Sequence, residues 1–519
     1  MESVAWECAL PTVITDSKLE QREQRPEDQG STSCIWETDS IKATNAQSSP
    51  VLLPTNPSRK QNNSRSWNDL QKAAPRFELG IKDLQSSALP LGHAAGGELS
   101  FPKQDRISRD APSLLVLSNG HGEDLIALRV LEQLRTHHPR PRLEVLPLVG
   151  VGSAFEAATQ AGWLTRIGPG AALPSGGFSN QSLRGLMADI GAGLPLLSWR
   201  QWRLVRQRAR QGATVLAVGD LLPLLMAWGS GARYGFIGTP KSDYTWRSGP
   251  GRQLSDRYHR CKGSEWDPWE WMLMRHRRCR LVAMRDALTA RGLKRLGIPA
   301  LAAGNPMMDG LKTAPPPASL QRCRRVLLLC GSRMPEACRN LERLLAAITP
   351  LSNSTPLAVL VALGTQPSPE QTEPILKKLG FRRGLPPSDQ LGAEACWVRG
   401  PLLVILGRNQ FTQWAGWAEI GLATAGTATE QLVGLGIPAL SLPGPGPQFH
   451  KPFAMRQARL LGGAVRPCSS GADLRERLET LLTSPELCQK LSAIGRSRMG
   501  RPGGSARLAE LVLERLHGY

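Results

Sequence analysis

The sequence predicts an α/β protein with two doubly wound parallel-sheet domains that face a cleft. From Ser113 onward, short apolar strands alternate with amphipathic helices, which is the pattern of parallel sheets covered by helices. The Pro-rich stretch Thr313–Ala318 interrupts this alternation, and its composition is typical of a linker between domains. Two α/β domains of similar size on either side of one linker imply a cleft between them.

The domain boundaries follow from changes in composition. Residues 1–110 are rich in Ser, Gln, Asn and Pro without a sustained hydrophobic period, so we expect a disordered, low-complexity extension. An N-terminal domain is expected over 111–313, a linker over 314–324, a C-terminal domain over 325–502 and a final helix over 503–519. Four apolar residues on one face of that helix must pack on other residues: Leu508, Leu511, Val512 and Leu516.

The strands are expected where short apolar runs are bounded by turn residues. In the first domain they are 113–118, 143–148, 214–218, 281–284 and 300–303, with helices over 124–137 and 155–160. In the second domain they are 326–330, 357–363, 402–406, 420–424 and 439–442.

The sequence has no feature of an exported or membrane-spanning protein. The longest apolar run, Leu357–Leu363, has seven residues, far fewer than the roughly 20 that a membrane-crossing helix needs. The first residues are acidic and lack the basic and apolar regions of a secretory signal. The cysteines form no C-x-x-C pair and no cluster with zinc spacing. We therefore expect a cytoplasmic protein.

The positive charge is confined to the predicted globular part. Residues 1–110 carry 13 Lys and Arg against 15 Asp and Glu, which leaves 51 against 28 for residues 111–519. Such a charge favours phosphorylated small molecules, anionic lipid headgroups or nucleic acid. Nucleic acid is not expected, because the basic residues are spread over both domains without a stacking or helix-turn-helix module.

A glycine turn follows the first predicted strand and reads Ser118-Asn-Gly-His-Gly-Glu-Asp124. Asn119, Gly120 and Gly122 would let a ligand approach the backbone at a helix N-terminus, and His121 follows a strand end, where open α/β sheets bind ligands. The spacing is not G-x-G-x-x-G, which counts against a dinucleotide site. The alternative is a plain tight turn.

Two further turns begin helices in the second domain. Gly331 and Ser332 could hold a phosphate through their N–H groups, and Arg333 would add a charged fork; the alternative is a helix cap with a surface arginine. Gly426 and Thr427 leave room for a pyrophosphate at the next such turn. Glu430, in the first turn of that helix, could accept hydrogen bonds from a ribose diol, or it could only complement the helix dipole.

Six motifs in this order resemble those of GT-B glycosyltransferases over nearly all of residues 111–513. The chain is most similar to lipid-A-disaccharide synthase and, closer still, to the cyanobacterial "lipid-A-disaccharide synthase-related" proteins. The peptidoglycan N-acetylglucosaminyltransferase that completes lipid II is a more distant likeness. The motifs are Ser118–Asp124, Gly150–Ser153, Gly219-Asp220, Gly304–Asp309, Gly331–Arg333 and Gly426–Glu430.

The resemblance implies two Rossmann-like domains and a role for each matched position. Gly331, Ser332, Arg333, Gly426 and Thr427 would hold the donor pyrophosphate, Glu430 the ribose, and Phe411 would lie near the base. Asn305 would mark the end of the first domain. Asp220 matches an essential aspartate of the lipid-A enzyme, and His121 matches a histidine of the lipid II enzyme.

The chemistry of sugar transfer is consistent with these two candidates. A base must take the proton of the acceptor hydroxyl, and N–H or cationic groups must stabilise the leaving diphosphate. We favour Asp220 as base over His121; the alternatives are a helix cap for Asp220 and a turn-stabilising or substrate-orienting histidine. The chain has no D-x-D motif, so neither a metal nor a cofactor is predicted, and a UDP-sugar would be the co-substrate.

The resemblance implies an inverting, metal-independent hexosyltransferase that moves a sugar from a UDP-sugar to a lipid-linked or membrane-associated acceptor. Two alternatives stay open: a UDP-sugar epimerase or hydrolase of the same fold, and a non-catalytic nucleotide-sugar-binding protein. The sequence does not indicate an oligomeric state.

Two segments bear on the acceptor. Trp199–Arg210 has five arginines and no acidic residue, with Trp199, Trp202 and Val205 at helical spacing. This predicts an interfacial helix on the cytoplasmic face of an anionic membrane; the alternative is a solvated basic face over a stripe packed in the core. The stretch Tyr244–Arg280 matches none of the motifs, and we expect it to shape the acceptor site.

Overall fold

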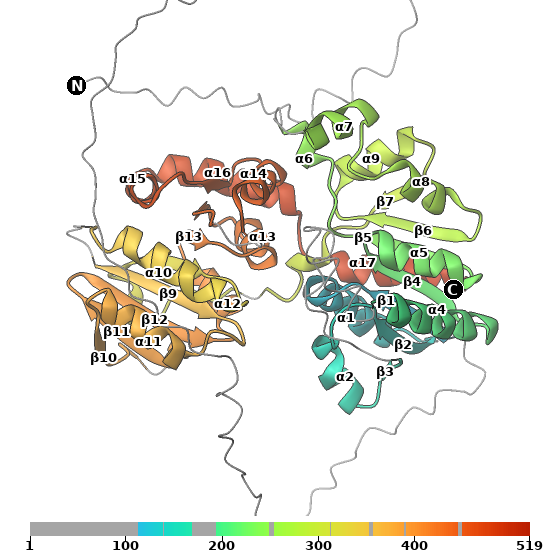
Figure 1. The fold of residues 1–519 in the computed structure, drawn as a ribbon, viewed down its shortest axis with the longest axis horizontal. Coiled ribbons are helices and arrows are strands. Elements are labelled where there is room, and N and C mark those ends of the chain that lie inside the picture. The colour runs from blue at the N-terminus through green and yellow to red at the C-terminus, as the bar shows by residue number, and fades with distance from the viewer. Residues whose placement is uncertain are drawn as a thin grey trace, which may run out of the picture. The chain divides into compact units, whose positions relative to one another are not determined.

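The computed structural model describes residues 113–518 except 139, 169–193, 249–253, 312, 352–355, 389–390 and 445–448. The disordered extension predicted for residues 1–110 therefore lies outside the described residues. All described residues belong to one compact unit, which contains two lobes, each built on one sheet with helices on both faces (Figure 1).

The N-terminal lobe contains a parallel sheet with the order β3-β2-β1-β4-β5-β6-β7. Its strands are β1 (Ser113–Ser118), β2 (Arg142–Pro147), β3 (Thr165–Arg166), β4 (Thr214–Gly219), β5 (Tyr234–Gly238), β6 (Cys279–Met284) and β7 (Ala300–Ala302). The strand order runs outward from β1 in both directions. This is a doubly wound arrangement with its switch point between β1 and β4.

Sequence reasoning missed β5. A Cβ on Gly235 would lie only 3.1–3.3 Å from side-chain atoms of Leu216, Leu281 and Leu516. This close packing requires glycine at a position where a β-branched residue would otherwise indicate a strand. The sequence of β5 therefore lacks the continuous apolar run by which the other strands were predicted.

Two hydrophobic cores cover the two faces of this sheet. One face packs against α1 (His121–Arg135), η2 (Ser153–Phe155), α2 (Glu156–Gln160) and α17 (Gly504–Val512), which continues as η7 (Leu513–His517). The other packs against α4 (Leu194–Arg210), α5 (Leu221–Ser230), α8 (Pro268–Arg275) and α9 (Ala287–Arg295). The chain end thus returns to the N-terminal sheet, and Figure 1 shows the red α17 among the blue and green elements. The predicted apolar face of this helix is buried there.

The C-terminal lobe contains a sheet with the order β10-β11-β12-β9-β8-β13-β14-β15. Its strands are β8 (Arg324–Leu329), β9 (Leu357–Leu363), β10 (Arg382–Gly384), β11 (Ala395–Arg399), β12 (Leu402–Arg408), β13 (Ile420–Ala423), β14 (Ala439–Ser441) and β15 (Val465–Pro467). All pairs are parallel except β10–β11 and β11–β12. The predicted α/β class with two doubly wound sheets is confirmed, with an antiparallel pair added at one edge.

Helices cover both faces of the second sheet as well. One face packs against α10 (Glu336–Ile348), α11 (Pro369–Lys378) and α15 (Gly471–Thr483), and the other against η5 (Ala318–Leu320), α12 (Phe411–Trp417) and α13 (Thr427–Gly434). The remaining helices of this lobe are α14 (Lys451–Leu460) and α16 (Pro485–Met499). None of the helices in the described ranges is both long and apolar enough to cross a membrane.

The turn η4 (Pro306–Met308) joins the lobes. Asn305, the predicted domain boundary, is buried and caps this turn by accepting a hydrogen bond from Met307 N at 3.2 Å. Gln431 of α13 donates to Met307 O at 2.8 Å, and Met308 lies in one core with Met499. Asp309 accepts hydrogen bonds from the backbone at the start of α17. The two lobes therefore share polar and apolar contacts next to Asn305.

Candidate functional site

Except for Asn305 and Phe411, which follow β7 and β12, the predicted site residues follow the four strands that border the two switch points. In open α/β sheets, ligands bind beyond the carboxyl ends of these strands. In the N-terminal lobe, the turn Asn119–Gly122 follows β1 and Asp220 follows β4. In the C-terminal lobe, Gly331–Arg333 follows β8, and Gly426 with Thr427 follows β13.

The turns of the two lobes meet. The hydroxyl oxygen of Thr427 lies 3.3 Å from the position that a Cβ on Gly122 would occupy. Thr427 is the first residue of α13, so the first glycine turn of the N-terminal lobe touches the N-terminus of that helix. Gly122 permits this approach because it has no side chain.

A pocket of about 220 Å3 lies at the carboxyl ends of β8 and β13. Its lining includes Gly331, Arg333 and Thr424 together with Arg339, Arg343 and the carboxylates Glu336 and Glu342 of α10. The predicted residues Ser332, Gly426, Thr427 and Glu430 do not line it. Burial lowers the pKa of Arg333 below its usual value. The pocket therefore places arginines beside the turn that the sequence predicts as a phosphate site.

Helix α14 supports the Gly426 turn, which sequence reasoning missed. Gln457 Nε2 donates to Gly426 O at 3.2 Å. The Phe453 Cζ lies 4.0 Å from the position of a Cβ on Gly426, and the Phe449 ring, 5.5 Å away between centroids, lines the pocket. The sequence of α14 has the pattern of an ordinary amphipathic helix and does not indicate this role.

Phe411 begins α12 and packs on a core of this lobe, so its place near a base stays a prediction.

Asp220 is the cap of α5. Its Oδ1 accepts hydrogen bonds from Leu222 N at 3.2 Å and from Asn119 Nδ2 at 2.8 Å. Burial raises the pKa of this carboxyl above its ordinary value. The capping alternative is therefore present in the structure, and the catalytic role of Asp220 stays a prediction.

Glu123 is a second carboxyl at this point, which sequence reasoning did not single out. Its Cγ lies 3.3 Å from the position of a Cβ on Gly219, so it packs on the turn that contains Asp220. Thr239 Oγ1 donates to its Oε1 at 3.4 Å. Burial raises the pKa of Glu123 to about 7. A carboxyl that titrates near neutral pH suits proton transfer.

His121 begins α1, and its side chain lies outside the described residues. Gly120 precedes it with a φ of 114°, a conformation that L side chains rarely adopt. The predicted role of His121 is therefore not tested.

Glu430 forms an ion pair with a residue of the other lobe. Arg285 Nη2 lies 2.7 Å from Glu430 Oε2, and 6% of the arginine side chain and 16% of the glutamate side chain are exposed. Arg285, which follows β6, also donates to Thr239 O at 3.3 Å. Burial alone would lower the pKa of Arg285, but the carboxylate of Glu430 holds it above its ordinary value. The sequence could not indicate Arg285, because its partner is 145 residues away.

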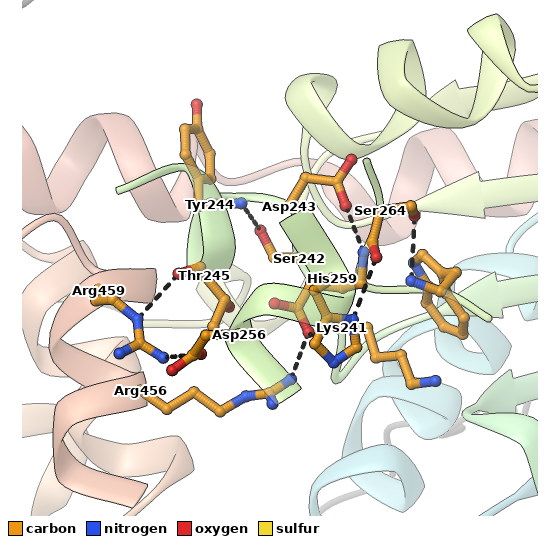
Figure 2. Close-up of polar contacts among 12 residues, drawn as sticks. Lys241, Ser242, Asp243, Tyr244, Thr245, Asp256, His259, Ser264, Arg456 and Arg459 are labelled. Carbon is orange, nitrogen blue, oxygen red and sulfur yellow. Dashed lines mark hydrogen bonds and ion pairs between the residues drawn. The ribbon is translucent and has the colours of Figure 1, made fainter. Parts of the chain in front are cut away.

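The stretch Tyr244–Arg280 contacts α14 of the C-terminal lobe, as Figure 2 shows. It contains α6 (Tyr244–Arg247) and α7 (Leu254–Lys262). Arg459 lies 2.7 Å from Asp256 Oδ1 and donates to Thr245 O at 3.1 Å, and Arg456 lies 2.7 Å from Glu265 Oε2. This stretch joins the lobes next to the Gly426 turn, and its predicted acceptor role is not tested.

Within the described ranges, no three His, Cys, Asp or Glu side chains gather in a way that would hold a metal ion.

The chain matches no protein-family model and no curated protein. Several solved structures are similar to it at low identity. The UDP-GlcNAc 2-epimerase of Neisseria meningitidis bound to UDP-GlcNAc is 16% identical over 78% of this chain and 100% of its own, with a TM-score of 0.47. The calicheamicin glycosyltransferase CalG4 is 14% identical over 78% and 99%, with a TM-score of 0.49. MurG of Acinetobacter baumannii is 14% identical over 78% and 100%, with a TM-score of 0.45.

The raised pKa of Glu123 predicts a pH-dependent stability difference between the wild type and Glu123→Gln. The folded state binds this proton more tightly than the unfolded state, so the wild type loses stability relative to the variant as the pH rises from 4.5 to about 7. The pH-dependent part of this difference should approach about 3 kcal/mol above this window and vanish below it. Urea unfolding between pH 4 and 8 measures it, with Glu479→Gln on the exposed face of α15 as the control. A difference that does not change with pH would show that Glu123 ionises normally.

Proposed function

We propose that this protein is an inverting GT-B glycosyltransferase that moves a sugar from a UDP-sugar to a lipid-linked or membrane-associated acceptor. The observation that carries the proposal is the meeting of the two switch points, where Gly122 touches Thr427 at the start of α13. A donor held on the C-terminal lobe would there face an acceptor held on the N-terminal lobe. The resemblance to lipid-A-disaccharide synthase supports the same reading, and it is the basis for the inverting course.

The C-terminal lobe would hold the donor. The backbone N–H groups at the start of α13 and at Gly331 and Ser332 suit a diphosphate, and Arg333 adds a fork of donors. Glu430 lies one turn into α13, where its carboxylate could accept hydrogen bonds from both ribose hydroxyls. No metal is required in this arrangement, because N–H groups and arginines would stabilise the leaving UDP.

The N-terminal lobe would hold the acceptor and take its proton. The acceptor oxygen would attack C1 of the sugar as the bond from C1 to the diphosphate breaks, and the proton of the acceptor hydroxyl would pass to a carboxylate. We assign this proton to the neighbouring pair of Asp220 and Glu123, with His121 as an orienting group. Asn119 Oδ1 is buried without a hydrogen-bond partner in the described structure, so it could accept a bond from an acceptor hydroxyl.

A basic helix would bring this site to a membrane. On α4, Val205 is buried, whereas Leu196 is 51% and Trp199 49% exposed, and the Arg203 guanidinium lies 4.8 Å from the centroid of the Trp199 ring. The predicted stripe is thus divided between the core and the surface. The exposed part suits the headgroup region of an anionic bilayer, where tryptophan and arginine are favoured.

The donor site predicts selective stabilisation by uridine nucleotides. In thermal unfolding of the full chain, UDP, UDP-GlcNAc or UDP-glucose at 100 times Kd should add about 2.7 kcal/mol of stability. NAD should add none. GDP-mannose carries guanine in place of uracil, so the stability that it adds measures the selectivity for the base. Glu430→Gln should reduce the UDP effect because it weakens the ribose contact. The absence of any effect of UDP compounds would refute the donor assignment.

The carboxyl pair predicts a loss of turnover without a loss of donor binding. Glu123→Gln and Asp220→Asn should each slow the release of UDP from UDP-GlcNAc by about 10²- to 10⁴-fold and leave the thermal shift by UDP unchanged. Lys490→Gln on the exposed face of α16 is the control. Conversion of the sugar without UDP release would identify an epimerase instead. Nucleotide binding with no effect of either variant on turnover would indicate a non-catalytic binding protein.

The membrane assignment predicts salt-dependent binding to vesicles. The full chain should sediment with phosphatidylglycerol vesicles at low salt and much less at high salt, because salt screens the arginines of α4. Trp199→Ser should weaken sedimentation, while Leu254→Ser, which changes another exposed apolar residue on α7, should not. Failure to sediment at either salt concentration would contradict a membrane role.

A further inference from the structure

Three ion pairs connect the two lobes among the described residues, each with a nitrogen–oxygen distance of 2.7 Å. Arg456–Glu265 and Arg459–Asp256 lie between α14 and the stretch Tyr244–Arg280 (Figure 2). Arg285–Glu430 involves the carboxylate that we assign to the donor ribose. The first two pairs leave the proposed donor site free, whereas the third occupies it.

A carboxylate that binds a vicinal diol uses both of its oxygens as acceptors. In the structure, Oε2 of Glu430 already accepts a hydrogen bond from Arg285 Nη2. Both side chains are largely buried, so water cannot replace either partner of this ion pair unless the side chains move. Although each carboxylate oxygen can accept more than one hydrogen bond, a ribose hydroxyl that binds Oε2 would have to share this enclosed oxygen with the buried guanidinium.

We propose that Arg285 gates the donor site: the ribose of the incoming nucleotide must displace this arginine from Glu430. The inference rests on the proposed function, because it takes Glu430 as the ribose ligand. The gate acts on the ribose alone. A ligand that carries only the diphosphate would bind at the N-terminus of α13 and at Arg333 without disturbing Arg285.

The surroundings of Arg285 make the exchange feasible. Its hydrogen bond to Thr239 O comes from Nη1, which does not contact Glu430. The carboxylate of Asp286 also lies close enough to favour the charged guanidinium, and so does Glu123 when it is ionised. When the ribose takes Glu430, the arginine keeps these partners in the N-terminal lobe, so its charge is not left buried and alone.

The test is isothermal titration of the full chain with UDP and with inorganic pyrophosphate. Arg285→Gln removes the competitor and should bind UDP at least about fivefold more tightly than the wild type, the lower end of ordinary coupling between sites. Its affinity for pyrophosphate should stay the same. Arg459→Gln is the matched control, because it breaks a pair between the lobes that does not involve Glu430, and it should leave both affinities unchanged.

Unchanged or weaker UDP binding by a folded Arg285→Gln overturns the gate while leaving the proposed donor site intact. An equal gain in Arg459→Gln also overturns it, because the gain would then come from looser lobes. If Arg285→Gln does not fold, Arg285→Lys, which has a single ammonium in place of the guanidinium, should bind UDP more tightly than the wild type by a smaller factor. UDP binding by Arg285→Lys that is no tighter than that of the wild type would overturn the gate. If Arg285→Gln binds UDP and the wild type does not, the gate is supported. If neither the wild type nor the variants bind UDP, both the proposed function and the gate are refuted.

Discussion

The parallel packing of strands around β1 and β8 is the constraint on which the rest of the structure depends. The side chains of Leu114–Leu117 in β1 are fully buried, so both faces of the sheet must be covered by helices. Parallel strands joined through helices place every carboxyl end at one edge of the sheet. Because the strand order reverses beside β1 and β8, the loops diverge there and leave space for a ligand. The candidate residues therefore lie where the topology requires them.

The connection between the lobes turns these two edges into one candidate site. The methionines of η4 and α16 share a core with α17, and α17 packs on the N-terminal sheet. This holds the start of α13 against the turn at Gly122. Apart from the pair Arg285–Glu430, the N-terminal side presents the carboxyls of Glu123 and Asp220, and the C-terminal side presents Arg333 beside helix N-termini. Proton removal and stabilisation of a leaving diphosphate would need this division.

The sequence predicts those parts of the fold and site that have a local cause. Leu357–Leu363 was predicted with its observed bounds, because a strand buried on both faces is a continuous apolar run. The edge strand β10 was missed because arginines replace the apolar residues there, and β5 was missed because packing requires glycine. The glycine turns were recognisable for the same local reason. Glu123, Arg285 and Phe453 were not, since their significance depends on burial and on partners far away in the chain.

A site that buries a carboxylate needs a hydrogen-bond or ion-pair partner for it both in the empty protein and in the complex with a ligand. Without ligand, an unpaired Glu430 would be costly in its largely enclosed position, and Arg285 removes that cost. In the proposed gate, the same contact would lower the affinity for any ligand that needs the carboxylate, because the pair would first have to be broken. Stability of the empty site and affinity for the nucleotide thus oppose each other at one pair of side chains. Since Arg285 belongs to the N-terminal lobe and Glu430 to the C-terminal lobe, nucleotide binding would change the contact between the lobes at this pair.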